Sequence, residues 1–424
     1  MKGSTLSSLV LALMAAMTAS SALAADTDGD GVIDPVDTCL LEANPGQQDT
    51  DFDGLGNACD ADFNQDGWVT AADYLLLRRR LNTRDPLTDL NGDGWVTAAD
   101  YLLLRAQLNQ PPGPAGVPTY RVHGLGLGPY VGEGEDPNLG DGQLTPERLR
   151  QRIQKVAAFT GWIRTFGCNN DLRSAGRLAH EAGLKIAAGA WLSGDRVENR
   201  NQMDCLLQEA VAGHVDLAVI GSEVLLRGDL GEAALVDYIE EAKQTLQAAG
   251  RSVPVTYSDV YGVLLGHAGV LASVDVVFAN YYPYWEGRPI ELAVAHLHRA
   301  HERLRAAAGG KPIIVSETGW PSCGTPVGEA APSPENAARF FLDFVSWARA
   351  GEVPYFYFET YDEPWKAAWE GPQGACWGLW TREGVIKPGM ERVFDNETVP
   401  SNWSEPLPDA PLVVDPLTLP AVTT

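Results

Sequence analysis

The sequence predicts an α/β protein, a (β/α)8 barrel preceded by a small region of acidic loops and short helices. Two observations predict this fold. Over most of the chain, short β-rich runs alternate with Ala/Leu/Arg-rich helical runs, and near the start an acidic pattern recurs in register. The length of 424 residues and the hydrophobic fraction of 45% fit one large globular domain and one smaller domain.

The chain is strongly acidic. It has 31 Lys and Arg residues against 56 Asp and Glu residues, a net charge of −25. Residues 25–110 alone hold 17 acidic and 5 basic residues. Such a chain repels phosphate backbones and anionic lipid, which excludes nucleic acid and membrane surfaces as partners. The acidic run also repels itself unless cations neutralise it.

The first residues have the composition of a secretory signal peptide. Lys2 gives a positive start, Leu9–Met17 is apolar but too short to span a bilayer, and Ala22-Leu23-Ala24 has a small-x-small cleavage pattern. Residues 1–24 are therefore predicted to be removed from an exported protein. A buried first helix is the alternative. The expected location is extracellular, or a periplasmic or cell-surface complex.

Six cysteines in an exported chain favour disulfides over a nucleophilic thiol. Sequence alone leaves their connectivity open. The simplest pairing joins neighbours along the chain: Cys39–Cys59, Cys168–Cys205 and Cys323–Cys376.

Four acidic segments share one register: Asp26–Asp37, Asp49–Asp60, Asp62–Asp73 and Asp89–Asp100. Each has Asp at position 1, Asp or Asn at 3, Asp at 5, Gly at 6 and Asp at 12. Oxygen atoms at alternate positions wrap around a hard cation and the glycine permits the sharp turn, as in an EF-hand loop. The pattern predicts structural Ca²⁺, with a solvated acidic loop as the alternative. The predicted ligands are Asp26, Asp28, Asp30, Asp37, Asp49, Asp51, Asp53, Asp60, Asp62, Asn64, Asp66, Asp73, Asp89, Asn91, Asp93 and Asp100.

The last two loops belong to a tandem repeat. DFNQDGWVTAADYLLLRRRLN and DLNGDGWVTAADYLLLRAQLN recur at a spacing of 27 residues, and helices are predicted over Tyr74–Leu81 and Tyr101–Leu108. This duplication, at residues 61–110, resembles a type I dockerin. The loops in residues 25–60 resemble thrombospondin type 3 repeats. In such modules calcium supplies folding energy that a small core lacks.

The dockerin resemblance implies a cohesin-bearing scaffold as a partner. Its contacts would be leucines and arginines of the two helices, although these leucines have the alternative role of packing the helices together. The residues are Leu75, Leu76, Arg78, Arg79, Leu102, Leu103 and Arg105.

A linker rich in Pro and Gly at residues 111–117 precedes the predicted barrel at 118–396, and a Pro-rich tail follows at 397–424. A doubly wound sheet is the competing fold, but no glycine-rich phosphate loop follows the first strand. The eight predicted strands are Tyr120–Leu127, Trp162–Gly167, Leu184–Trp191, Asp216–Ser222, Val253–Tyr257, Val274–Tyr282, Pro312–Ser316 and Tyr355–Thr360.

Two predicted strands end in glutamates. Glu223 follows the fourth strand in DLAVIGSEVLLRG, and Glu317 follows the seventh in KPIIVSETGWPS. Residues after the strands of such a barrel line the face where chemistry takes place. Burying a carboxylate at the end of an apolar strand costs free energy, so each glutamate needs a role that offsets this cost. The alternative to a catalytic role is a salt bridge to a neighbouring helix. Aromatic residues whose faces suit sugar rings surround these motifs, among them Tyr257, Trp285 and Trp320.

The motifs SETGWPS, IGSEVLLRG, FANYYPYWEG and YFYFETYDEPWK, the last followed by GACWGLW, resemble glycoside hydrolase family 17 in its bacterial and fungal β-1,3-glucanase branch. The resemblance implies a retaining mechanism, with Glu317 as nucleophile and Glu223 as acid/base. It also implies that Tyr281 or Tyr282 hydrogen-bonds the nucleophile and that Arg164 lies beneath it. The residues that fall where the family builds its glucan cleft are Glu359, Asp362, Glu363, Trp365 and Lys366.

One residue departs from the family pattern. The family has Asn before the acid/base, where the amide touches the sugar 2-hydroxyl, and this chain has Ser222. The shorter hydroxyl predicts reduced or altered activity. The sequence therefore predicts a secreted hydrolase of laminarin-type β-1,3-glucan. The alternatives are a β-1,3-glucanosyltransferase and, in another class, a glucan-binding or scaffold-docked protein without catalysis.

Overall fold

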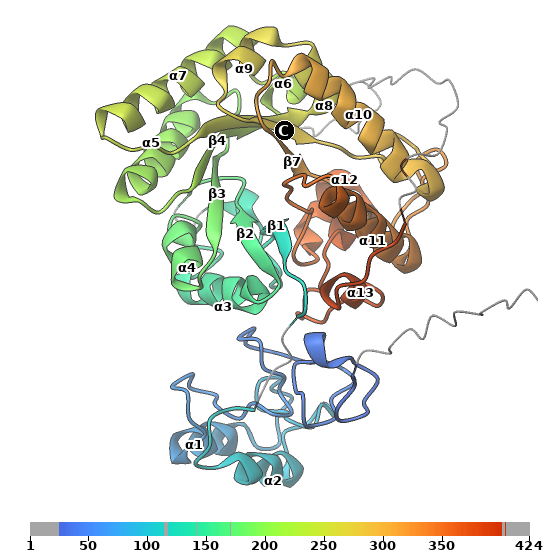
Figure 1. Ribbon diagram of the computed structural model, residues 1–424. Helices are drawn as coiled ribbons and strands as arrows, with labels where there is room; N and C mark the ends of the chain where they lie inside the picture. Colours follow the sequence, from blue (N-terminus) through green and yellow to red (C-terminus); the bar gives the residue numbers. More distant parts are fainter. Residues whose placement is uncertain (1–24, 114–117, 141, 170, 401–402, 404–424) are drawn as a thin grey trace, which may run out of the picture.

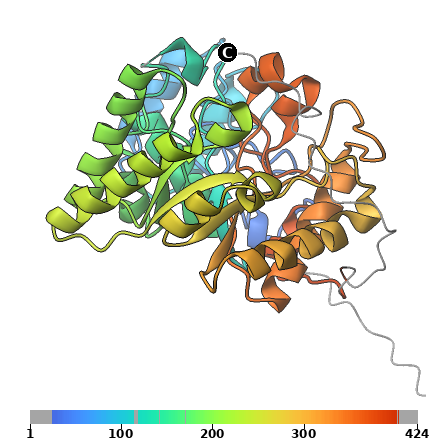
Figure 2. The same cartoon turned by 90° about the horizontal axis from the view of Figure 1, so that it is seen from above.

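The computed structural model describes residues 25–113, 118–140, 142–169, 171–400 and 403. Its sheet has 7 parallel strands in chain order, each hydrogen-bonded to the next. In Figure 1 the strands form an inner ring with helices outside it, and Figure 2 shows the same layering from above. The strands are β1 (Val122–Gly126), β2 (Thr160–Arg164), β3 (Lys185–Ala190), β4 (Leu217–Ser222), β5 (Val255–Val260), β6 (Val277–Asn280) and β7 (Ile313–Glu317).

The predicted (β/α)8 architecture is confirmed, with one difference at the eighth strand. The segment predicted as a strand closes the ring through isolated bridges, which join Tyr355 to Val315 of β7 and Tyr357 to Leu125 of β1. Beyond Tyr357 single backbone bonds continue on both sides: the N–H of Phe358 donates to the Thr318 carbonyl at 2.8 Å, and that of Thr360 donates to the Gly126 carbonyl at 2.9 Å. The eighth segment therefore completes the barrel without forming a regular strand.

The long helices of the barrel bury one face against the sheet. α11 starts with the Ser333 side chain accepting from the Asn336 N–H, and α5 ends at Gly213 with a left-handed φ of 92°. The long helices are α3 (Pro146–Ala157), α4 (Ala175–Glu181), α5 (Arg196–Ala212), α7 (Glu232–Ala248), α10 (Ala293–Ala307) and α11 (Pro334–Ala350). Short helices lie in the connections: α6 (Val224–Arg227), α8 (Tyr261–Leu265), α9 (Ala268–Ser273), α12 (Ala367–Glu370), α13 (Glu391–Phe394), η2 (Pro137–Leu139), η3 (Ile290–Leu292), η4 (Pro364–Lys366) and η5 (Pro372–Cys376).

The N-terminal region, blue in Figure 1, lies below α3 and α13. It contains η1 (Asp34–Val36), α1 (Ala71–Arg80) and α2 (Ala98–Gln107). Both α-helices begin three residues before their predicted starts at Tyr74 and Tyr101, because Thr70 and Thr97 form capping boxes with the Asp three residues later. Fully buried Leu77 and Leu104 lie in the small core of this region.

The three predicted disulfides are confirmed: Cys39–Cys59, Cys168–Cys205 and Cys323–Cys376. No helix within the described part of the chain has the length and apolar character needed to cross a membrane. The predicted signal peptide, residues 1–24, lies outside the described residues, as do linker residues 114–117 and most of the predicted tail.

The bridge between Cys323 and Cys376 joins the loops that follow β7 and the eighth segment, closing a separation of 53 residues. Loop-closure entropy for this length amounts to about 4 kcal/mol. Replacing both cysteines by Ser should therefore lower the free energy of unfolding of the barrel by about 3–4 kcal/mol. Equilibrium unfolding in denaturant measures this change. An unchanged midpoint would show that the bridge does not stabilise the folded barrel.

Candidate active site

The two predicted catalytic glutamates lie at the C-terminal ends of β4 and β7. Glu317 is the last residue of β7, and Glu223 directly follows β4. The chain turns sharply here, since Gly221 and Glu223 have left-handed φ angles of 86° and 54°. The N–H of Glu223 then donates to the Ser258 carbonyl of β5 at 2.8 Å. The backbone of Glu223 is therefore held by two neighbouring strands.

Three donors surround the Glu317 carboxylate. Arg164, at the end of β2, donates through Nη1 to Oε1 at 2.7 Å, and the Tyr282 hydroxyl donates to Oε2 at 2.9 Å. The Ser222 hydroxyl donates to Oε1 at 3.3 Å. Arg164 and Glu317 are both buried, so water screens this ion pair little. This surrounding suits an anion.

Glu223 is held by an asparagine that sequence reasoning missed. Asn280, the last residue of β6, donates through Nδ2 to Glu223 Oε1 at 2.8 Å. Its Oδ1 accepts from the hydroxyls of Ser258 and Ser316 at 2.9 and 2.5 Å, which fixes the direction of the amide. The signal available in the sequence was one amide inside the apolar run Val274–Tyr282.

The surroundings of Glu223 favour its protonated form. Burial, followed by the negative charges of Glu317 and Asp259, raises the pKa of Glu223 to about 8. Asp259 lies on β5 and accepts a hydrogen bond from the Tyr257 hydroxyl. Burial raises the pKa of Asp259 to about 6. Sequence reasoning named Tyr257 but missed Asp259, because the predicted strand ended at Tyr257.

Aromatic rings pack around Tyr282. The rings of Tyr282 and Trp285 lie 5.5 and 5.9 Å from that of Trp377. Two other predicted substrate-binding aromatics, Trp320 and Tyr281, are buried in the hydrophobic core. The sequence left Tyr281 and Tyr282 as alternatives, and the structure brings Tyr282 to the carboxylate.

The charged residues predicted for the glucan cleft pair with one another. Lys366 Nζ bonds the carboxylates of Glu359 and Glu363, and all three side chains are buried. Asp362 pairs with Lys387 at 2.6 Å. These groups are therefore paired within the protein. Their ion pairs stabilise the segment that follows Tyr357, after the eighth segment of the barrel.

A further carboxylate, missed in the sequence, lies close to this cluster. Glu370 accepts a hydrogen bond from Trp377 Nε1 at 3.0 Å. Burial raises the pKa of Glu370, and the charge of Glu317 adds to the increase. Glu370 thus belongs to the electrostatic surroundings of the two glutamates.

Trp365, predicted to bind substrate, is partly buried against the core.

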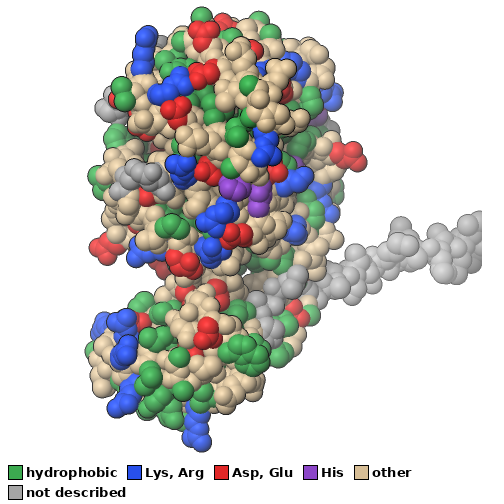
Figure 3. Space-filling view, turned by 90° about the vertical axis from the view of Figure 1, so that its left-hand side faces the viewer, with side chains coloured by type: hydrophobic (Ala, Val, Ile, Leu, Met, Phe, Trp, Pro, Cys, Tyr) green, Lys and Arg blue, Asp and Glu red, His purple; other side chains and the backbone are tan. Residues whose placement is uncertain are grey.

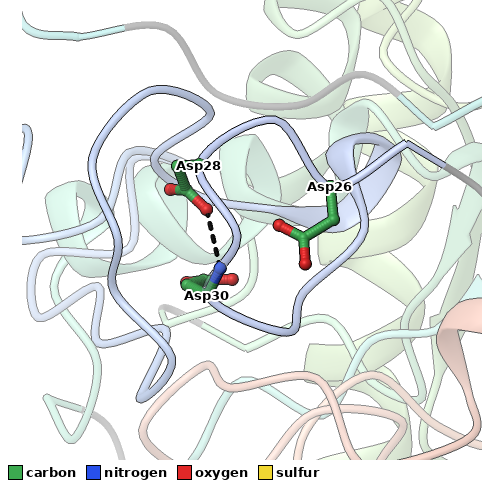
Figure 4. A group of neighbouring side chains, drawn as sticks. All are labelled: Asp26, Asp28 and Asp30. Carbon is green, nitrogen blue, oxygen red and sulfur yellow. Dashed lines mark hydrogen bonds between the residues drawn. The ribbon is translucent and has the colours of Figure 1, made fainter.

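The acidic loops have the ligands expected of calcium sites. Figure 4 shows Asp26, Asp28 and Asp30 around one turn of backbone; their carboxylate oxygens lie within 4.8 Å of one another, as do those of Asp49, Asp51 and Asp53. Burial and neighbouring carboxylates raise the pKa of Asp51 to about 8. Buried oxygens without a hydrogen-bond partner belong to Asp28, Asp37 and Asp89. Converging, unpaired carboxylates fit a hard divalent cation.

A barrel with one carboxyl of raised pKa after strand four and one arginine-bonded carboxylate after strand seven has the pair of carboxyls that glycoside hydrolases use. The sequence matches the BtgE/BtgC glycoside hydrolase domain over residues 130–378, and the chain belongs to this family. It also matches the dockerin type I domain over residues 24–82 and 60–109. The dockerin match thus includes the loops that resemble thrombospondin type 3 repeats.

Relatives and solved structures agree with this family. The chain is 28% identical over 290 residues to glucan 1,3-beta-glucosidase BGL2 of Candida albicans, covering 64% of this chain and 92% of that protein. It is 30% identical over 264 residues to a glucan 1,3-beta-glucosidase of Arthroderma benhamiae, covering 57% and 84%. The crystal structure of a family 17 beta-1,3-glucanosyltransferase from Rhizomucor miehei matches with a TM-score of 0.56 and 27% identity, covering 63% and 96%.

The pKa of Glu223 should fall when Asp259 is replaced by Asn, because the change removes a negative charge that raises it. Glu223 would then lose its proton at a lower pH. Carbon-13 NMR of labelled glutamate carboxyls, titrated in both proteins, measures the difference. Asp275→Asn, an exposed change before β6, is the matched control and should leave the titration unaltered. A Glu223 titration that is the same in Asp259→Asn and wild type would contradict the electrostatic account.

Proposed function

We propose that this chain hydrolyses β-1,3-glucan with retention, using Glu317 as the nucleophile and Glu223 as the acid/base. One observation carries the proposal: Glu317 lies among three donors, whereas Glu223 has a pKa near 8. Two carboxyls in such different surroundings suit the two roles. The names of the relatives, glucan 1,3-beta-glucosidases, support the substrate.

In the first step a Glu317 oxygen attacks the anomeric carbon, and the bond to the glycosidic oxygen breaks. Glu223 gives its proton to the departing oxygen. Asn280 donates to Glu223 Oε1, so Oε2 is the oxygen that carries this proton. Arg164 and Tyr282 hold the nucleophile in place throughout.

In the second step Glu223, now ionised, takes a proton from water, whose oxygen attacks the anomeric carbon and releases Glu317. When a sugar hydroxyl replaces water, the same steps transfer the glucan chain. This second activity is favoured by the resemblance to a solved beta-1,3-glucanosyltransferase. Chromatography of products from laminari-oligosaccharides separates the two, since transfer gives chains longer than the substrate.

Ser222 has a different role from the asparagine that the family places there. Its hydroxyl lies 3.2 Å from Arg164 Nη2 and 3.3 Å from Glu317 Oε1. It therefore serves the nucleophile instead of reaching the sugar 2-hydroxyl. Loss of that amide contact is consistent with altered activity. Reducing-sugar release from laminarin distinguishes the hydrolase from the non-catalytic alternative, because a protein that only binds glucan would release none.

The N-terminal module binds calcium and recruits a partner of the cohesin type. Leu75 and Leu102 are 48% and 60% exposed although they lie on short helices, so their main role is not helix packing. Leu76 and Leu103 are half-buried. Figure 3 shows hydrophobic and basic side chains together at the lower end of this module, where α1 and α2 lie. The exposed arginines among them are Arg78, Arg79 and Arg105.

The organisation along the chain follows from these roles. A signal peptide at 1–24 exports the protein, the calcium module at 25–110 leads through the 111–117 linker to the enzyme at 118–396, and a tail at 397–424 follows. The protein acts outside the cell on polysaccharide, without a cofactor in catalysis.

Replacing Glu317 by Ala should lower turnover of laminarin by about 1000-fold or more, because the change removes the carboxylate that forms the glycosyl intermediate. Glu223→Ala should spare attack on activated aryl β-glucosides, whose leaving group needs no acid, and azide should rescue it as a β-glycosyl azide. Reducing-sugar release and NMR of the azide product measure these effects.

The matched control is Glu329→Ala, an exposed glutamate in the loop after β7, which should retain activity. Substantial turnover by Glu317→Ala, or an α-configured azide from Glu223→Ala, would show that the roles are wrongly assigned.

A further inference from the structure

The Asp49–Asp60 loop lies against the catalytic barrel. Lys155 of α3 forms an ion pair with Asp49, the first predicted ligand of this loop. Lys155 is 3% exposed and Asp49 is 1% exposed, so the pair is buried between the two parts of the chain. Among the described residues, the corresponding Asp26, Asp62 and Asp89 form no ion pair with the barrel. In the part of the chain that the structure describes, the Asp49–Asp60 loop is therefore the one of the four whose first Asp is joined to the barrel by an ion pair.

This contact leaves the geometry of the loop unchanged. The N–H of Gly54 donates to Asp49 Oδ2 at 3.1 Å. The equivalent bond from the position-6 glycine to the position-1 Asp is present in the other three loops, at 3.1, 2.6 and 2.8 Å. The oxygens of Asp49, Asp51 and Asp53 still converge within 4.8 Å. Asp49 thus belongs to the metal site and to the barrel contact at once.

Position 4 of this loop is Phe52, a bulky residue in a backbone conformation that bulky residues rarely adopt. Phe52 has a left-handed φ of 63°, and the equivalent positions hold Gly29, Gln65 and Gly92, also at positive φ. A bulky residue is uncommon in this conformation. The Phe52 ring packs edge-on against Tyr361 of the barrel, with centroids 6.0 Å apart. Barrel packing explains why an aromatic residue occupies this position.

Apolar contacts also cross the junction: Val36 is buried in the hydrophobic core of the barrel, and Val32 and Ile33 pack against that core. A cavity of about 270 Å³ lies there, with Val36 and Leu55 on one side and Phe159 and Trp380 on the other. The Asp49–Asp60 loop itself reaches the barrel through the Asp49–Lys155 ion pair and through the Phe52 ring, which lies against Tyr361 and Gly384.

The other side of the loop holds the dockerin-like repeat. Thr50 and Asn57 both donate to the Pro86 carbonyl, at 3.1 and 2.8 Å. Gln107 of α2 donates to the Ala58 carbonyl at 3.0 Å and accepts from the Ala61 N–H at 3.0 Å. The Asp49–Asp60 loop is therefore the element between the barrel and the helices that carry the partner surface.

We propose that the Asp49–Asp60 loop is a calcium-dependent clamp that seats the N-terminal module on the barrel. Calcium fixes the loop in the shape that presents Asp49 to Lys155 and Phe52 to Tyr361, so metal binding and docking stabilise each other. Calcium thereby sets the position of the partner-binding helices relative to the enzyme. The inference rests on the calcium binding proposed above and is independent of the catalytic roles.

The test is hydrogen exchange of the full chain, followed at α3 and residues 380–386 in calcium and in EGTA. Amides at the C-terminal end of α3 should exchange about tenfold faster in EGTA. Phe52→Gly gives the loop the residue found at position 4 in two other loops. It should keep the calcium content measured by elemental analysis yet show fast α3 exchange even in calcium. Lys155→Met should behave in the same way.

The matched control is Asn82→Gly, the same kind of change at an exposed residue after α1 with a left-handed φ of 61°, which should leave α3 exchange as in wild type. Calcium-loaded wild type with α3 exchange insensitive to EGTA, or Phe52→Gly with wild-type exchange, would overturn the clamp alone. Wild-type protein that binds no calcium would overturn both the clamp and the proposed metal sites.

Discussion

The guanidinium of Arg164 is buried at the mouth of the barrel, where it joins strands that are far apart in the sequence. It donates to the Ser316 carbonyl and the Glu317 carboxylate of β7 and to the hydroxyl of Ser222, the last residue of β4. A buried guanidinium without a carboxylate, or the reverse, would be strongly destabilising, so each fixes the other. The position of the Glu317 carboxylate therefore follows from the pairing of one buried cation, Arg164.

The second carboxyl depends on the first. Glu223 has no cation bonded to it in the described structure; it has the Asn280 amide, and the charge of Glu317 disfavours its ionisation. Burial is the main cause of the raised pKa of Glu223, and the negative charge of Glu317 adds to it. The asymmetry between the two glutamates therefore comes from the burial of Glu223 together with the arginine that is bonded to Glu317 alone.

Sequence reasoning found the parts of the site that local patterns encode. A glutamate ending an apolar strand is visible in both IGSEVLLRG and SETGWPS, and the calcium register is visible in four loops. Asp259 was missed because the predicted strand ended at Tyr257, three residues before the end of β5. Asn280 was missed because a single amide in an apolar run has no local signature. The choice between Tyr281 and Tyr282 depends on which side chain faces the barrel mouth, which adjacent tyrosines do not reveal.

The contact between the two parts of the chain was beyond sequence reasoning for a related reason. Lys155 lies 106 residues from Asp49 and looks like any lysine of an amphipathic helix. Only the fold shows that it is buried against an acidic loop. A module with 17 acidic and 5 basic residues has too few basic side chains to neutralise its own acidic ones. Metal ions can neutralise the loops, while the barrel supplies a buried cation at one of them. The acidic module and the enzyme are therefore joined by an ion pair as well as by the polypeptide chain. Acidic residues that contribute to the net charge of −25 thus help to hold the two parts together.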